Sequence, residues 1–336
     1  MSAQIRYKSS WDLAKLDYFD LRDGRLVISE PKKWRSFDAH THLALSYALP
    51  NQVDLLRGHD RSEVYLQLDR PLDLDVYANK NFWPADLKSM TRDLTLMSMT
   101  PYGMRRTHTL TNLLRDMDDA GITHSLLLPI DFPVLSHNAE TYLRTTTGQD
   151  RIICFGSVHP YTPDIARKLD WQKAAGAWGV KVHPAVQLMR PDHPKCMELY
   201  RMCAERDLMV MWHCGPVGIE PPAGRRRCQL PYYEQPIAEN PDVTFILGHS
   251  GALQMDAALG LANRYPNAWL DLSSQGLRNI RRILEDGPRD RLLPGSDWPF
   301  YHQSLHLAKI LIATEGDESL RTQVLWDNAA RLFGLS

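Results

Sequence analysis

The chain has 336 residues, enough for about two domains of ordinary size or for one eight-stranded α/β barrel with an insertion. Hydrophobic residues make up 43% and charged residues 24%, which is typical of a globular protein and excludes a disordered chain, a collagen and a disulfide miniprotein. The 39 basic and 40 acidic residues give a formal net charge of -1, so we expect neither nucleic acid nor an anionic membrane as a partner.

The N-terminus and the cysteines indicate the cellular compartment in which we expect the protein. The first residues, MSAQIRYKSS, are polar and lack the apolar centre of a signal peptide. No apolar run approaches the roughly 20 residues that a membrane span needs. The five cysteines are odd in number and form no CxxC pair. We therefore expect a cytoplasmic protein with reduced thiols.

Short apolar runs alternate along the chain with longer amphipathic stretches. The runs that we interpret as strands are 35–42, 124–131, 151–159, 178–183, 208–213, 243–249, 267–273 and 291–297. Continuous apolar runs of this length fit parallel strands that are covered on both faces. Residues 110–120, 194–206 and 252–264 carry helical spacing between them.

Eight strands separated by helices favour a parallel α/β architecture, and eight is the number that closes a (β/α)8 TIM barrel. A doubly wound open sheet is the alternative, but no glycine-rich phosphate loop follows the first strand. Residues 43–106 form a long insertion after strand 1. They either pack on the outside of the barrel or, as we prefer, form a lid, because they follow a strand end at which barrel active sites lie.

Several predicted strands end in a side chain that can bind a metal ion. His40 and His42 alternate within the first strand, so both imidazoles face one side and suit a borderline divalent cation. His213 and His249 end two later strands, and Asp297 follows the last one. A single histidine at a strand end is more often structural than a metal ligand. Chance rarely brings four histidines and one aspartate together at the same predicted face of the barrel. We therefore predict a metal site there.

These residue types also predict a chemistry. Three imidazoles and one carboxylate would leave an open position on the metal for water or substrate. A divalent metal lowers the pKa of bound water toward about 7, and a neighbouring histidine can accept or donate a proton near that pH. Asp297 could bind the metal and accept a proton, or it could instead cap the helix that follows it.

Five motifs occur in a fixed order: FDAHTH, WGVKVHP, MWHCGP, FILGHSGA and PGSDWPF, with NAARLFG near the C-terminus. This set resembles the amidohydrolase superfamily. It is most similar to the amidohydrolase-related branch that contains aminocarboxymuconate semialdehyde decarboxylase. The resemblance runs from about residue 37 to residue 333. The insertion and the first 35 residues carry none of it.

The resemblance implies a distorted (β/α)8 barrel, with residues 1–336 as a single domain and a metal at its C-terminal face. It makes His40 and His42 the metal ligands from strand 1, His213 the ligand from strand 5 and Asp297 the ligand from strand 8. His249 corresponds to the strand 6 histidine that acts on the metal-bound water.

Lys181 and His183 share one face of a strand. In binuclear members of the superfamily, a lysine on strand 4 is carboxylated and bridges two metal ions. The branch most similar to this chain generally uses one ion. We therefore prefer a role in substrate binding or beside the metal ligands for Lys181 and His183, with a structural ion pair as the remaining alternative for Lys181.

Two further positions bear on the substrate. Arg225 opens a run of three arginines after strand 5, which either is a solvated basic loop or clamps a substrate carboxylate. Trp298 follows Asp297 and either lines an aromatic pocket or packs in the core.

The leading hypothesis is a metal-dependent hydrolase, in which metal-activated water attacks an amide, ester or lactone bond of a small molecule that can carry a carboxylate. His249 and Asp297 would move the protons. The alternative is a non-oxidative decarboxylase, a carboxy-lyase, on the same metal site. A non-catalytic metal-binding sensor is the third hypothesis, which the complete set of ligand positions disfavours. Zinc is the default ion, and manganese or iron is the alternative. The sequence leaves the oligomeric state open, with a homodimer as the commonest assembly of soluble proteins.

Overall fold

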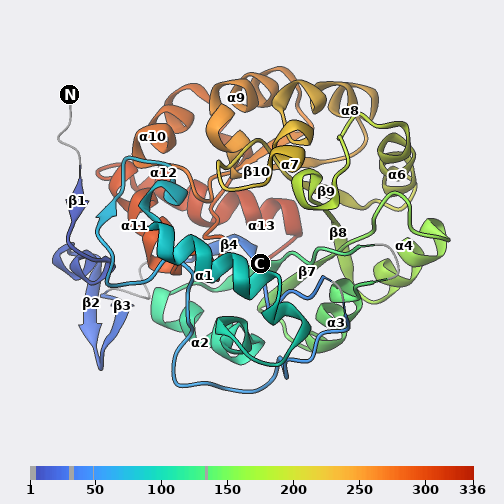
Figure 1. The fold of residues 1–336 in the computed structure, drawn as a ribbon. Helices are drawn as coiled ribbons and strands as arrows, with labels where there is room; N and C mark the ends of the chain where they lie inside the picture. The colour runs from blue at the N-terminus through green and yellow to red at the C-terminus, as the bar shows by residue number, and fades with distance from the viewer. Residues whose placement is uncertain (1–4, 30–33, 48, 133–134) are drawn as a thin grey trace.

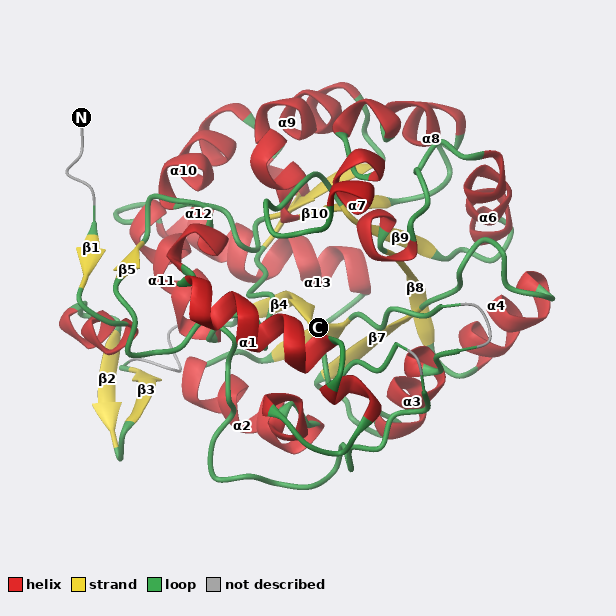
Figure 2. Ribbon diagram, viewed as in Figure 1, coloured by secondary structure: helices red, strands yellow, loops and turns green. Residues whose placement is uncertain are grey.

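The computed structural model describes residues 5–29, 34–47, 49–132 and 135–336, and its central feature is one sheet of eight parallel strands. The strands follow the order β12-β11-β10-β9-β8-β7-β6-β4, and helices surround them (Figures 1 and 2). Their bounds are β4 (Phe37–Thr41), β6 (His124–Leu127), β7 (Ile152–Gly156), β8 (Ala177–Val182), β9 (Met209–His213), β10 (Phe245–Gly248), β11 (Ala268–Asp271) and β12 (Leu292–Leu293). The predicted parallel α/β barrel is confirmed.

The barrel closes between β4 and the segment that follows β12. The backbone N–H of Ala39 donates to Pro294 at 2.7 Å, that of Asp297 to His40 at 2.8 Å, and that of His42 to Trp298 at 2.7 Å. Residues 294–298 therefore continue the pairing that the short β12 begins. The register shifts between β4 and β6 and again between β7 and β8, which distorts the barrel locally.

Helices cover the outside of the barrel, as predicted from the spacing of apolar residues. Their bounds are α2 (Leu110–Ala120), α3 (Asn138–Thr145), α4 (Ile165–Ala174), α5 (Pro184–Gln187), α6 (Pro194–Ala204), α7 (Pro222–Arg227), α8 (Glu234–Glu239), α9 (Met255–Arg264), α10 (Leu277–Asp286), α11 (Gln303–Ala313), α12 (Glu318–Thr322) and α13 (Asn328–Phe333). The helix expected from residue 252 begins at Met255, because the turn η6 (His249–Gln254) contains left-handed residues. No helix in the described part of the chain is long and apolar enough to cross a membrane.

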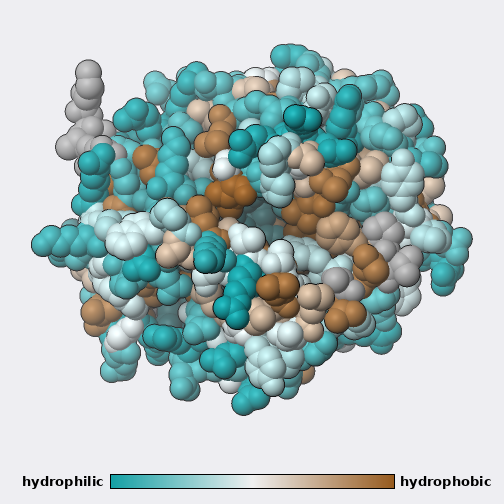
Figure 3. All heavy atoms as spheres, in the orientation of Figure 1, coloured by the Kyte–Doolittle hydropathy of each residue, from teal (hydrophilic) through white to brown (hydrophobic). Residues whose placement is uncertain are grey.

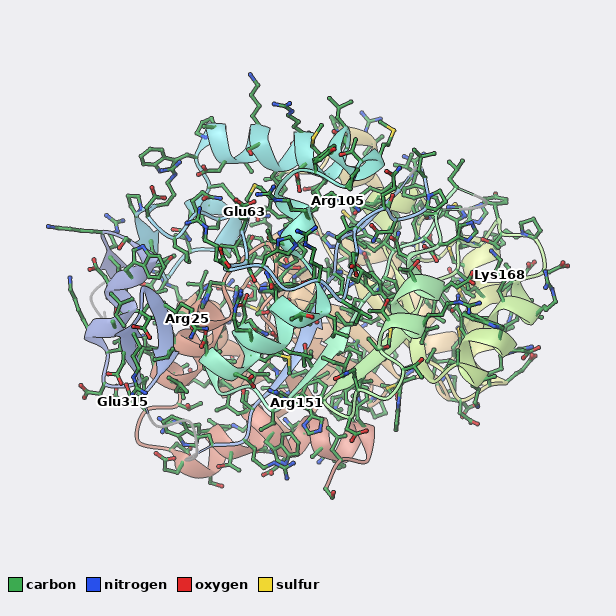
Figure 4. All side chains as sticks on the ribbon, turned by 90° about the horizontal axis from the view of Figure 1, so that it is seen from below. Arg25, Glu63, Arg105, Arg151, Lys168 and Glu315 are labelled. Atoms are coloured by element: carbon green, nitrogen blue, oxygen red, sulfur yellow. The ribbon has the colours of Figure 1, made fainter. Side chains whose placement is uncertain are left out.

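One end of the barrel is filled with apolar side chains and closed by α13. Strand residues such as Phe37, Phe155, Met211 and Trp269 form one buried cluster with Phe333 of that helix. The Phe333 ring stacks on Phe37 with 5.2 Å between centroids. In Figure 4, α13 lies at the bottom and α1 (Pro84–Leu94) crosses the opposite end of the barrel. The active site should therefore lie at the α1 end of the barrel, where the carboxyl ends of the strands lie.

Residues 43–106 lie between β4 and α2, and they pack into the main hydrophobic core. They contain β5 (Leu72–Asp73), η2 (Ala78–Asn81), α1, η3 (Met97–Met99) and η4 (Met104–Thr107). Arg105, seen between α1 and the strands in Figure 4, is buried and donates to the Leu45 and Thr100 carbonyls and to Asn51 at 2.7–3.1 Å. Movement of this insertion as a lid stays a prediction.

The N-terminal residues form small sheets beside the barrel. β1 (Arg6–Tyr7) pairs antiparallel with β5 of the insertion, and η1 (Ser10–Lys15) follows it. β2 (Phe19–Arg22) and β3 (Arg25–Ile28) form a hairpin at the left of Figure 1.

Candidate metal centre

The residues that the sequence predicts as ligands gather at the carboxyl ends of the strands. His40 and His42 lie at the end of β4, and His213 is the last residue of β9. His249 follows β10, and Asp297 lies after β12. All five side chains are buried. Figure 3 shows this end of the molecule with a hollow near its middle and hydrophobic side chains beside it.

Three of these residues point donor atoms at one place. Asp297 Oδ1 lies 3.7 Å from His40 Nε2 and 3.5 Å from His42 Nε2, and the donor atoms of the three residues lie within 4.8 Å of one another. The other ring nitrogens are occupied: His40 Nδ1 lies 2.6 Å from Asp271 Oδ2, and His42 Nδ1 donates to the Leu128 carbonyl at 2.6 Å. These contacts fix the rings and direct both Nε2 atoms toward Asp297, where a metal ion could bind them.

His213 lies beside this group with a free nitrogen. Its ring stacks on His183 with 3.9 Å between centroids and lies 4.9 Å from the His249 ring. Burial lowers the pKa of His213 to about 3, so the imidazole is neutral at neutral pH. Its Nε2 is buried and has no hydrogen-bond partner among the described residues. A buried lone pair of this kind is costly unless a ligand uses it, so the donor set fits a divalent metal ion.

Asp271 is a site residue that the sequence analysis missed. Its carboxylate accepts hydrogen bonds from His40 Nδ1 at 2.6 Å, from the His249 backbone N–H at 3.0 Å and from the Ser273 hydroxyl at 2.5 Å. Ser273 in turn lies 2.8 Å from His249 Nδ1. The signal was present, because residues 267–273 form a predicted strand in which an aspartate lies near the carboxyl end. Asp271 thus holds two histidines of the site in place.

Lys181 reaches into the same place from β8. Its Nζ lies 3.2 Å from His40 Nε2, and burial lowers the pKa of the amine to about 8. His183, which follows β8, accepts the Val186 backbone N–H through Nδ1 and stacks on His213. The structure therefore brings both predicted residues to the histidine cluster. Their roles in substrate binding stay predictions.

The other two predicted substrate residues point elsewhere. Arg225 donates to the Gly218 carbonyl at 3.1 Å, lies 3.4 Å from a Glu220 carboxylate oxygen, and is half exposed. The Trp298 indole is fully buried and donates to Asp116 of α2 at 3.0 Å. Neither side chain contacts the histidine cluster within the described residues. Their substrate-binding roles stay predictions that these contacts do not favour.

A family model described as amidohydrolase matches residues 37–335. The chain belongs to the amidohydrolase family. Members of this family are enzymes, so this chain is an enzyme. The match covers all the strand-end motifs described above. None of the curated proteins compared matches this amidohydrolase.

Solved structures with low sequence identity share the fold of this amidohydrolase. A probable 2-pyrone-4,6-dicarboxylic acid hydrolase from Acinetobacter baumannii is 15% identical, with 89% of this chain and 99% of that chain covered and a TM-score of 0.56. A 2,6-dihydroxybenzoate decarboxylase from Rhizobium is 17% identical, with 89% and 99% covered and a TM-score of 0.57. An amidohydrolase from Burkholderia multivorans with bound HEPES is 15% identical, with 90% and 100% covered and a TM-score of 0.58. A hydrolase and a decarboxylase thus both occur among similar structures.

Left-handed backbone occurs beside the candidate metal centre of this amidohydrolase. His249, Ser274 and Asp297 have φ angles of +55°, +62° and +63°, a left-handed conformation that is unfavourable for residues other than glycine. Each such residue costs on the order of 1–3 kcal/mol, and strain of this kind is typical of functional sites. The three residues follow the adjacent strands β10, β11 and β12.

The contacts of Trp298 predict a structural effect of its replacement. Trp298→Phe should lower the free energy of unfolding by about 1–3 kcal/mol, because the buried Asp116 carboxylate loses a donor and a small cavity opens. Denaturant unfolding measures this loss, and Trp83→Phe, at an exposed tryptophan of the insertion, is the matched control. A large fall in kcat/KM at unchanged stability would contradict the structural role and support substrate binding instead.

Proposed function

We propose that this amidohydrolase is a metal-dependent hydrolase that cleaves an amide, ester or lactone bond of a small molecule. The observation that carries the proposal is the convergence of His40 Nε2, His42 Nε2 and Asp297 Oδ1, with the unpartnered Nε2 of His213 beside them. The 2-pyrone-4,6-dicarboxylic acid hydrolase among the similar structures supports a lactone or a related carbonyl compound as the substrate.

The chain would hold one metal ion through His40, His42, His213 and Asp297. When bound, a divalent ion polarises a carbonyl oxygen and makes hydroxide available near neutral pH. Zinc suits the imidazole-rich donor set best, and manganese or iron can use the same ligands.

His249 is placed to move a proton. Its Nδ1 lies 2.8 Å from the Ser273 hydroxyl, which leaves Nε2 as the ring nitrogen available to the reaction. Burial lowers the pKa of His249 well below its ordinary value, and the nearby histidines lower it further, so the ring is neutral in the resting enzyme. Asp297 is the second group that could take a proton, through the carboxylate oxygen that does not face the two histidines.

Lys181 supports a substrate that carries a carboxylate. It is a buried cation beside His40, and no carboxylate lies within salt-bridge distance of it in the described part of the chain. A substrate anion would offset the cost of burying this charge.

A non-oxidative decarboxylase is the second candidate, and the same lysine favours it. The decarboxylation of an aromatic acid needs a carboxylate held near the metal, and a 2,6-dihydroxybenzoate decarboxylase is among the similar structures. Release of carbon dioxide without oxygen consumption would support this reaction over hydrolysis.

His249→Asn provides the test of the proposed function. We expect the variant to keep its metal ion and to lose about 10²–10⁴-fold in kcat, because the proton acceptor is gone. The substrates are a panel of esters, amides, lactones and aromatic acids, assayed for hydrolysis products and for carbon dioxide.

His193→Asn is the matched control, since the contacts of His193 among the described residues are with Arg190, the start of α6 and the Tyr161 ring. Full activity of His249→Asn on the substrate that the wild type converts would contradict the mechanism. A metal-loaded wild type that converts nothing in the panel would support a binding role instead.

A reducing compartment such as the cytoplasm suits this enzyme. Its five cysteines are all free and buried, and none is paired in a disulfide.

A further inference from the structure

Asp38 is a buried carboxylate of β4 that the proposed reaction does not use. Its Oδ1 accepts the backbone N–H of His40 at 3.2 Å and that of Ser296 at 2.8 Å. Its Oδ2 accepts the Ser296 hydroxyl at 2.6 Å and the side-chain amide of Gln303 at 2.7 Å. Only 2% of Asp38 is exposed, so these four hydrogen bonds offset the cost of burying the carboxylate.

The side chain of Asp38 takes part in the pairing that closes the barrel between β4 and residues 294–298. The Asp297 N–H donates to the His40 carbonyl at 2.8 Å, as expected between neighbouring strands. The N–H of Ser296, one residue earlier, donates to the Asp38 carboxylate instead. Asp38 therefore ties the residue before one expected ligand to the strand that carries another.

Gln303 reaches Asp38 from the helix layer outside the barrel. It is the buried first residue of α11, and its amide NH2 group must face Asp38, because a carboxylate only accepts hydrogen bonds. Its Oε1 is buried without a partner among the described residues. The bond to Asp38 is thus the one side-chain hydrogen bond that Gln303 makes within the described part of the chain.

The segment that Asp38 holds packs closely against the metal centre. A Cβ atom on Gly295 would lie 2.2 Å from Oδ1 of Asp271 and 3.1 Å from the Cβ atom of His40. The backbone just before Asp297 therefore approaches His40 and its carboxylate partner as closely as a glycine allows. A movement of this segment would change the position of Asp297 relative to His40.

We propose that Asp38 and Gln303 are positioning residues that set where Asp297 lies relative to His40. Asp38 fastens Ser296 to β4, and Gln303 holds the Asp38 carboxylate in the orientation that accepts both backbone N–H groups. The two expected ligands are thus held from outside the barrel. This inference rests on the proposed function, because it acts through the ligands of the metal ion.

The test measures the Zn²⁺ affinity of the protein by competition with a chromophoric chelator. It also records the visible absorption of bound Co²⁺, which reports the coordination geometry. We expect Asp38→Asn to change the Co²⁺ spectrum and to weaken Zn²⁺ binding about tenfold, the lower end of the range for partners of metal ligands. An asparagine has one acceptor oxygen, so it cannot accept from all the donors that Asp38 serves.

An exchange of the two side-chain groups tests the contact between Asp38 and Gln303 directly. Gln303→Glu should weaken Zn²⁺ binding, because it sets a second carboxylate against Asp38. Adding Asp38→Asn to Gln303→Glu should restore part of the affinity, because the asparagine amide can donate to the new carboxylate. If either single variant fails to fold, Gln303→Met, which removes only the donor, should weaken Zn²⁺ binding by a smaller factor.

Asp93→Asn is the matched control. Asp93 is a buried carboxylate of the insertion that accepts the backbone N–H groups of Met104 and Arg105 and the Tyr65 hydroxyl at 2.8–3.0 Å. None of these partners is an expected ligand or lies next to one in the sequence. The variant should lower the free energy of unfolding, as Asp38→Asn does, and leave the Zn²⁺ affinity and the Co²⁺ spectrum unchanged.

The outcomes distinguish the positioning role from the proposed function. If Asp38→Asn binds Zn²⁺ and Co²⁺ like Asp93→Asn, the positioning role is wrong and the metal centre stands. The same holds if Asp38→Asn restores no affinity to Gln303→Glu. If the wild type binds no Zn²⁺ or Mn²⁺, the metal centre and the positioning role are both contradicted.

Discussion

Protein purified without chelators or added metal is expected to hold about one divalent ion per chain, and His42→Ala is expected to lose it. His42 contributes one of the two Nε2 atoms that face Asp297 Oδ1, and no other side chain in the described residues can replace it from β4. Loss of a direct ligand should weaken metal affinity by more than about 100-fold, beyond the range found for partners of ligands. Elemental analysis of the purified protein measures the metal content.

His137→Ala is the control for this experiment, since His137 is an exposed histidine before α3 and should leave the metal content unchanged. About two ions per chain would support a carboxylated Lys181 that bridges them and a binuclear hydrolysis. If the wild type holds no metal even after reconstitution, the proposed metal-dependent chemistry is contradicted, whereas the assignment of the barrel fold is unaffected.

Asp271→Asn is expected to weaken metal binding by about 10–100-fold, although Asp271 does not belong to the expected ligand set. The carboxylate uses both of its oxygens: Oδ2 accepts from His40, from the His249 backbone and from the Ser273 hydroxyl, and Oδ1 accepts the Ser273 backbone N–H at 2.9 Å. An asparagine amide has one acceptor oxygen, so its NH2 group must face one of these two sets of donors. One buried donor is then left unpaired, which should also lower the free energy of unfolding by about 1–3 kcal/mol. Zn²⁺ competition and denaturant unfolding measure the two effects.

Asp131→Asn is the matched control, because Asp131 is another buried carboxylate, and it accepts the backbone N–H groups of Asn138 and Ala139 at the start of α3. Its replacement should affect stability alone. Equal metal affinity in Asp271→Asn and the wild type would show that His40 needs no carboxylate to orient it.

The ligand residues could be predicted because they lie where a periodic pattern ends. His40, His42 and His213 each end an apolar run, and parallel strands bring such ends to one edge of a barrel. Asp271 ends its strand in the same way, but its role depends on which carboxylate approaches His40 Nδ1. That contact follows from the twist and closure of the barrel, which no local pattern encodes.

Other features depend on backbone turns that the sequence does not reveal. Strand alternation fails at Asp297, because its left-handed backbone turns the chain and sends Trp298 toward α2 instead of toward the site. The insertion has no recognisable periodicity, so the hydrogen bond from the Ala78 N–H to the Ser274 carbonyl depends on the path of the whole segment. The family resemblance covered the barrel strands and could not extend to either feature.

The closure of the barrel between its first and last strands also sets an order of events during synthesis. His40 and His42 leave the ribosome well before the segment 294–298 that pairs with β4. Phe333, which stacks on Phe37 at the start of β4, emerges later still. Until that segment has been made, the nascent chain carries an open sheet edge and two histidines without Asp297 beside them, and chaperones and free metal ions have access to both.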